Sequence, residues 1–137
     1  RMTTFFRYRL RFPAGLHVAA EGFGEESASV TVASDTLLSA VCAAAAKLYG
    51  PDGAVPLLDD GAVQLSSAFP FIRDEDFLPR PLSFFPEVPE EQYALLKRLK
   101  KVRFLSRSLF EAVLHGRVPE PEVDKLRDGL WYEGPSP

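Results

Sequence analysis

Basic and aromatic side chains are interleaved in two tracts that contain no acidic residue. The first tract is residues 5–12, where Arg7, Arg9 and Arg11 alternate with aromatic and aliphatic residues. The second tract is residues 95–107, which includes Lys100, Lys101 and Arg103. Because the whole chain has a formal charge of -3, its bases are segregated rather than abundant. This pattern is typical of a face that binds a polyanion, although ordinary solvated faces would also explain it.

Serine and phenylalanine residues provide a second set of candidate contacts. The Ser66 and Ser67 hydroxyl groups can form hydrogen bonds with a nucleic acid. Four aromatic rings lie near prolines, namely Phe69, Phe71, Phe84 and Phe85. Such rings could stack on unpaired bases, but aromatics in this setting more often form a core or a protein interface. We therefore predict that they contact a protein partner.

His17 is the one residue with a plausible catalytic interpretation. It follows the first basic tract, where a general acid or base for RNA cleavage could lie. A lone histidine in a turn is more often a hydrogen-bonding or stacking residue, because acid-base catalysis usually needs a positioned partner. We therefore group His17 with the RNA contacts and predict no catalytic residue.

Motifs for cofactors and metals are missing from the sequence. It contains no phosphate-binding glycine loop and no CxxC pair. Its two histidines and one cysteine have no suitably spaced carboxylates, so we expect no metal site and no cofactor.

The overall composition predicts a globular domain. The chain has 137 residues, of which 46% are hydrophobic and 12% aromatic. A single cysteine, Cys42, is typical of a reducing compartment, which favours a cytoplasmic location. The longest apolar run, near residues 37–48, is too short to span a bilayer, so we expect no membrane association.

Hydrophobic periodicity predicts the elements that position these residues. Residues 3–12 alternate with a period of two, which predicts a strand with one buried face and one basic face. Ser34 is expected to cap a helix that ends at Gly50, and Ser106 to cap another that ends at Gly116. The other expected elements are a short strand or lead-in over 28–33, strands over 63–72 and 102–105, an irregular edge segment over 77–85, and a helix over 89–99.

The order of these elements predicts an α+β fold. A strand, a helix, two strands, a helix and a strand form a ferredoxin-like, RRM-like βαββαβ unit, here with long proline-rich loops. We predict that residues 1–116 form this domain. Residues 117–137 are expected to be a polar tail or the start of a missing second half.

Four sequence motifs resemble those of one family. The motifs are residues 34–40 (SDTLLSA), 65–71 (LSSAFPF), 77–81 (FLPRP), and 99–106 (LKKVRFLS) leading into 109–111. In this order they resemble the N-terminal half of the RAMP-superfamily Csm subunit of type III-A CRISPR complexes, which caps the 5′ end of the guide RNA. This sequence departs from the family in one respect. Family members are about twice as long and carry, in their second half, a glycine-rich loop that this sequence lacks.

This resemblance implies a fold, partners and site residues. It implies a RAMP domain that holds the 5′ tag of the crRNA and contacts the large polymerase-like subunit and the backbone RAMP subunits. Arg80, in the third motif, joins the expected RNA contacts on this basis. The resemblance implies a scaffold rather than an enzyme.

Two other functions stay open. One is a metal-independent RAMP endoribonuclease that processes CRISPR transcripts, with His17 in its active site. The other is a protein-interaction module whose basic faces meet acidic partners. The sequence does not separate type III-A from type III-B complexes.

Overall fold

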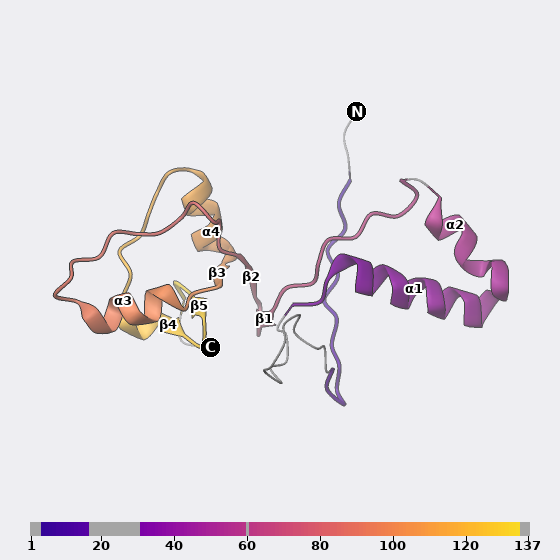
Figure 1. Cartoon of the computed structure of the whole chain (residues 1–137), viewed down its shortest axis with the longest axis horizontal. Coiled ribbons are helices and arrows are strands. Elements are labelled where there is room, and N and C mark those ends of the chain that lie inside the picture. Colours follow the sequence, from indigo (N-terminus) through magenta and orange to yellow (C-terminus); the bar gives the residue numbers. More distant parts are fainter. Residues whose placement is uncertain (1–3, 17–30, 60, 135–137) are drawn as a thin grey trace. The chain divides into compact units, whose positions relative to one another are not determined.

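The computed structural model describes residues 4–16, 31–59 and 61–134. The chain divides into two compact units, Arg1–Ala68 and Phe69–Pro137 (Figure 1). The described residues form four α-helices and a five-stranded mixed sheet, so the predicted α+β class is confirmed. The ferredoxin-like arrangement and the domain boundary at residue 116 stay predictions.

The first unit is mainly helical in its described part. Its elements are α1 (Ser34–Tyr49), the 3-10 helix η1 (Pro51–Ala54) and α2 (Val55–Leu58). An isolated antiparallel bridge joins Val32 to Ala68. Only Ala45 of α1 is buried, whereas Leu48 and Tyr49 are 73% and 78% exposed.

The predicted bounds of α1 are nearly correct, but its predicted cap is wrong. Ala33 takes the extended N-cap conformation, with ψ of 147°, and makes no side-chain capping bond. Ser34 is therefore already inside the first turn, where its hydroxyl cannot play the N-cap role. Gly50 ends the helix with φ of 90°, a conformation that glycine adopts without steric cost.

The strand predicted over residues 3–12 is not observed in residues 4–16, which the structure describes. The backbone turns at Phe12, whose carbonyl accepts a hydrogen bond from the Gly15 amide at 2.9 Å. Phe6 and Tyr8, expected on the buried face, are 77% and 79% exposed. Of the short strand predicted over 28–33, residues 28–30 lie outside the described residues, and residues 31–33 form only the isolated bridge at Val32.

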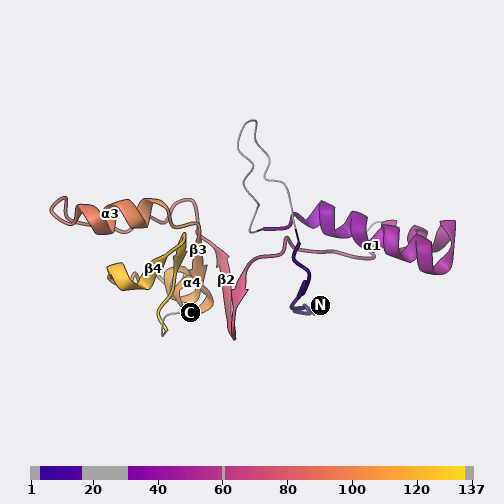
Figure 2. The same ribbon diagram turned by 90° about the horizontal axis from the view of Figure 1, so that it is seen from below.

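The second unit carries the sheet. Its strands are β1 (Phe71–Ile72), β2 (Glu75–Pro79), β3 (Phe104–Ser106), β4 (Leu126–Arg127) and β5 (Leu130–Trp131), and its helices are α3 (Tyr93–Lys100), α4 (Arg107–Leu114) and the 3-10 helix η2 (Val123–Lys125). The strand order is β1-β2-β3-β5-β4, in which only the β3–β5 pair is parallel. Figure 2 shows β2, β3 and β4 together with α4.

Alternate residues of the strands enter two hydrophobic clusters, as a period of two requires. Leu105 and Trp131 are register partners across β3 and β5, and they join the cluster that contains Leu99 of α3 and Leu109 of α4. Phe104 and Leu130 are the preceding partners and join the other cluster. That cluster is built from Phe77, Phe104 and Tyr132, with Phe69, Ile72 and Leu130 packed against it.

Residues beyond 116 contribute to this core. Leu126, Trp131 and Tyr132 are each no more than 2% exposed. The Tyr132 hydroxyl donates a hydrogen bond to the Asp124 carbonyl at 2.7 Å. The expected polar tail thus supplies two strands and part of the core within its described residues.

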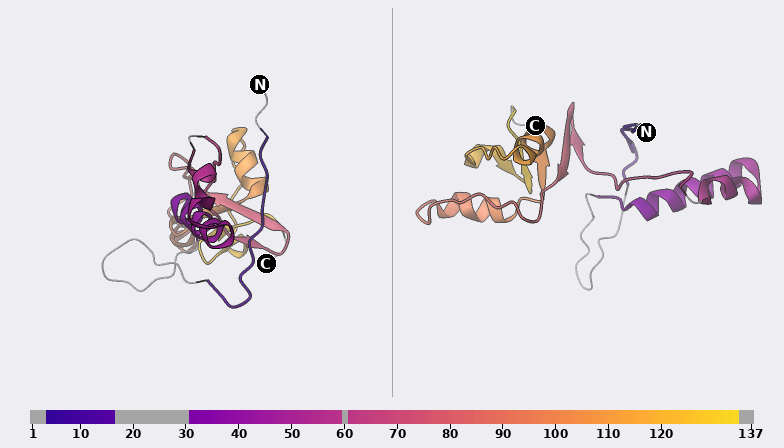
Figure 3. Two further views of the ribbon diagram at one scale, coloured as in Figure 1. Left: turned by 90° about the vertical axis from the view of Figure 1, so that its right-hand side faces the viewer. Right: turned by 90° about the horizontal axis from the view of Figure 1, so that it is seen from above.

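The predicted strand over 63–72 is mostly irregular. Only Phe71–Ile72 is a strand in this range, and it begins directly after Pro70, which has no amide hydrogen to donate to a ladder. The segment between β2 and α3 is also irregular, and it leads away from the sheet before α3 returns toward it (Figures 1 and 3).

Candidate nucleic-acid interface

The basic surface of the second unit lies where α3 leads into β3. Lys100, Lys101 and Arg103 are all exposed there. Lys97, Arg98 and Lys100 occupy the last turn of α3, where cations complement the helix dipole. Stabilisation of the helix therefore explains some of the basic residues at this position without any bound ligand.

We call the connection from α3 to β3, with Lys100, Lys101 and Arg103, the basic corner. Its backbone is held by hydrogen bonds from two sides. The Arg103 amide donates to the Gly129 carbonyl at 2.8 Å, and the Arg103 carbonyl accepts from the Arg80 amide at 2.9 Å. The Arg103 side chain therefore projects from a fixed backbone. A fixed cation loses less entropy on binding an anion than one on a mobile loop.

Two arginines near this corner bind backbone carbonyls. The Arg80 guanidinium donates to the Leu99 carbonyl at 3.3 Å and lies 5.6 Å from the centre of the Phe85 ring. The Arg98 guanidinium donates to Val123 and Leu126 carbonyls at 3.0 and 3.3 Å. These hydrogen bonds link α3 to the residue that follows β2 and to the segment from η2 to β4, so both arginines have structural roles.

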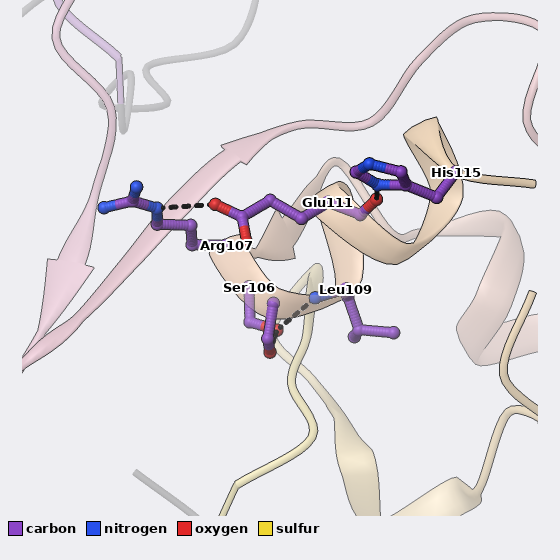
Figure 4. A network of polar contacts seen from close by, with 6 residues as sticks. Ser106, Arg107, Leu109, Glu111 and His115 are labelled. Atoms are coloured by element: carbon purple, nitrogen blue, oxygen red, sulfur yellow. Dashed lines mark hydrogen bonds and ion pairs between the residues drawn. The ribbon is translucent and has the colours of Figure 1, made fainter. Parts of the chain in front are cut away.

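Arg107, at the end of the second basic tract, is paired within α4. Its Nε lies 2.9 Å from Oε1 of Glu111, and both side chains are more than half exposed (Figure 4). Such an exposed pair contributes little to stability. His115 closes the same helix, with Nδ1 2.7 Å from the Glu111 carbonyl oxygen.

The predicted Ser106 cap is confirmed. Its hydroxyl accepts a hydrogen bond from the Leu109 amide at 3.4 Å, which satisfies an otherwise unpaired donor of the first turn (Figure 4). The cap fixes the junction between β3 and α4 directly after the basic corner.

The remaining predicted RNA contacts belong to the first unit. Arg7 and Arg11 are exposed and Arg9 is half-buried, in the extended segment that precedes the Phe12 turn. The Ser66 hydroxyl donates to the Ser67 carbonyl at 2.9 Å. His17 lies outside the described residues, so its predicted role stays a prediction.

The four phenylalanines predicted at a partner interface differ in burial. Phe84 is 9% exposed and stacks on Trp131 with ring centroids 6.0 Å apart. It is a core residue, which leaves the adjacent Phe85, 47% exposed, as the ring accessible to a partner. Phe69 and Phe71 are half-buried, and Phe69 packs against the Phe77 cluster.

A basic cavity beside this corner was missed by the sequence analysis. It has a volume of about 390 Å³ and is lined by Arg98, Lys101, Val102, Leu126, Arg127, Asp128 and Gly129. The Asp128-Gly129 dipeptide, typical of two-residue hairpins, could have revealed the turn that lines this cavity, although not the cavity itself.

Comparison with known proteins finds a curated relative. This relative is the CRISPR system Cms protein Csm4 of Thermococcus onnurineus (strain NA1), 35% identical over 100 residues, which is 64% of this chain. The chain is related to Csm4. The predicted resemblance to a Csm subunit of the RAMP family is thereby confirmed.

The match to Csm4 covers only part of that protein. The chain spans about a third of the relative's length, 35%. No protein-family model matches the chain, and no solved structure matches it.

The described residues hold neither a cluster suited to a metal ion nor a membrane-spanning helix. In those ranges no three histidine, cysteine or acidic residues are grouped so that they could hold a metal ion. Nor is any helix there long and apolar enough to cross a membrane.

Proposed function

We propose that this chain is an RNA-binding scaffold subunit of a type III CRISPR ribonucleoprotein in antiviral defence. In this proposal it holds the 5′ tag of the crRNA and contacts the large polymerase-like subunit and the backbone RAMP subunits. The observation that carries the proposal is the 35% identity to Csm4. The exposed bases Lys100, Lys101 and Arg103 on a hydrogen-bonded backbone support it.

Positioning of RNA rather than cleavage suits this surface. Exposed lysines and arginines on a fixed backbone bind phosphates and thereby set the register of a strand, while base contacts provide specificity. We propose that the chain is not an enzyme. Incubation with tag RNA in EDTA tests this, because metal-free cleavage that is lost in His17→Ala would establish the endoribonuclease alternative.

Reconstitution tests the scaffold role. The chain is combined with the other subunits of a type III-A complex and crRNA, and the assembled particle is analysed by native mass spectrometry. We expect one copy of the chain to enter the particle and to crosslink to the 5′ tag after irradiation. A particle that assembles fully without the chain, and excludes it when it is added, would contradict the proposal.

The same reconstituted assembly tests whether the exposed Phe85 ring contacts a partner subunit. We propose that Phe85, rather than the buried Phe84, contributes to the partner contact, because large exposed aromatics anchor interfaces. The Phe85→Ala chain is expected to enter the particle less efficiently and to keep its fold.

A further inference from the structure

Two cavities of the second unit share a wall. The basic cavity of about 390 Å³ and a second one of about 210 Å³ are both lined by Arg127 and Asp128. The second cavity is completed by two apolar residues, Ile72 of β1 and Leu130 of β5. A cationic hollow and an apolar hollow therefore meet at the β4–β5 turn.

The β4–β5 turn is rigid. Asp128 and Gly129 have φ of 51° and 79°, as the two central residues of a type I′ hairpin require. The Gly129 carbonyl accepts hydrogen bonds from the amides of Arg103 and Phe104 at 2.8 and 3.2 Å. A Cβ atom at Gly129 would lie 3.2 Å from the Lys101 carbonyl oxygen, so the turn packs closely against the α3–β3 connection.

The described residues that line the basic cavity carry a net positive charge. Three bases line it, Arg98, Lys101 and Arg127, against a single carboxylate, Asp128. Nε of Arg127 lies 3.6 Å from Oδ2 of Asp128, and the two side chains are 65% and 87% exposed. An ion pair this exposed is weak, so an incoming anion can compete for Arg127 at little cost.

Carbonyl groups near the end of α3 are already hydrogen-bonded, which reduces their repulsion of an anion. Unpaired carbonyls at a helix C-terminus repel negative charge. The Leu99 carbonyl, however, accepts from Arg80 Nη1 and from the Val102 amide, and the Arg98 carbonyl accepts from the Lys101 amide. The Leu126 carbonyl is likewise bound by Arg98 Nη1.

We propose that these adjoining cavities bind one nucleotide unit of a single-stranded RNA. The phosphate lies between Lys101 and Arg127, and the base lies against Ile72 and Leu130. The proposal rests on the proposed RNA-binding function and specifies where on the second unit one nucleotide sits. Phosphate contacts give position and apolar contacts with the base add affinity, which matches the chemistry of the two hollows.

The sequence offers a single reporter for the apolar cavity. Ile72 is the only isoleucine of the chain, so its δ1 methyl group gives one resonance in the NMR spectrum of the full chain. Three probes are titrated: an oligouridylate hexamer, its abasic ribose-phosphate analogue, and inorganic polyphosphate. The hexamer is expected to shift both the Ile72 methyl and the Gly129 amide resonances, whereas the two probes without bases shift only Gly129 and bind more weakly.

Charge removal tests the basic cavity. The double variant Lys101→Ala/Arg127→Ala is expected to bind the hexamer at least about tenfold more weakly, because it removes both charged donors to the phosphate. The matched control Lys47→Ala/Arg117→Ala removes the same charge at exposed positions outside both cavities, and is expected to stay within about twofold of the parent. Amide spectra of both variants verify the fold.

Three outcomes would overturn the proposal. They are an Ile72 resonance that does not move at saturation, equal affinity for polyphosphate and the hexamer, and equal losses in the two double variants. The scaffold role has a separate readout, because incorporation into the reconstituted particle does not depend on this cavity alone. A Lys101→Ala/Arg127→Ala chain that binds RNA normally and enters the particle would refute this site and leave the scaffold role intact.

Discussion

Phe84 and Trp131 stack on each other with ring planes 20° apart, although 46 residues lie between them in the sequence. Phe84 comes from the irregular segment before α3, and Trp131 lies in β5 beside Leu105. Through this pair, the irregular segment between β2 and α3 packs against the hydrophobic core beside the sheet. The pair also makes the last strand part of the fold that positions the basic corner.

We expect Phe84→Ala to lower the free energy of unfolding of the second unit by about 3 kcal/mol, because it removes a buried ring and leaves a cavity. Phe85→Ala is the matched control and should cost below about 1 kcal/mol, since that ring is 47% exposed and the Arg80 guanidinium lies over it. Urea denaturation followed by Trp131 fluorescence measures both. Equal losses in the two variants would mean that the stacked pair does not stabilise the core.

Removal of residues 117–137 tests the predicted domain boundary. The truncation deletes Leu126, Trp131 and Tyr132 from the two hydrophobic clusters, so we expect the second unit to lose cooperative unfolding. Circular dichroism and amide spectra of the truncated chain report this directly. A well-dispersed spectrum with a cooperative transition would instead establish residues 1–116 as a domain.

Gly129→Ala should destabilise the second unit by about 1–2 kcal/mol. Both the positive φ and the approach of its backbone to the Lys101 carbonyl oppose a side chain. Gly116→Ala is the control, because Gly116 has a φ of 72° but no atom within 4 Å of an added Cβ. The difference between the two variants isolates the close approach, and identical midpoints in urea would show that it costs nothing.

Reversal of the charge at the basic corner should weaken RNA binding. In the Lys100→Glu/Lys101→Glu/Arg103→Glu variant, each lost phosphate contact reduces the slope of log affinity against log salt by about 0.7. The control Lys47→Glu/Arg73→Glu/Arg117→Glu changes the net charge equally, at three other exposed positions. Fluorescence anisotropy across a salt series compares them, and an unchanged slope in the first variant would exclude the corner from the RNA site.

The helices were the most predictable part of the fold. Local signals locate α1 between residue 34 and Gly50 and place the Ser106 cap before α4. The Ser34 cap was misplaced by one residue, because whether Ala33 or Ser34 takes the extended conformation depends on where the preceding chain enters the helix.

Strand pairing was much less predictable. The parallel contact between β3 and β5 joins Leu105 to Trp131, and no local pattern specifies such a distant partner. The role of Arg80 and Arg98 as donors to carbonyls was equally hidden, since charge in a sequence does not reveal which guanidinium groups the backbone already occupies. The Asp128-Gly129 dipeptide is typical of a hairpin turn, but the sequence analysis predicted a polar tail there and missed the β4–β5 hairpin.

The sparse burial along α1 has a consequence for the lifetime of the chain. Among the described residues of the first unit only Ala45 is buried, so little apolar area offsets the entropy of ordering this helix. Segments of low local stability open often, and proteases cut what opens. In a free chain the first unit should therefore be digested well before the second, and its rate of opening should set how long an unassembled copy survives.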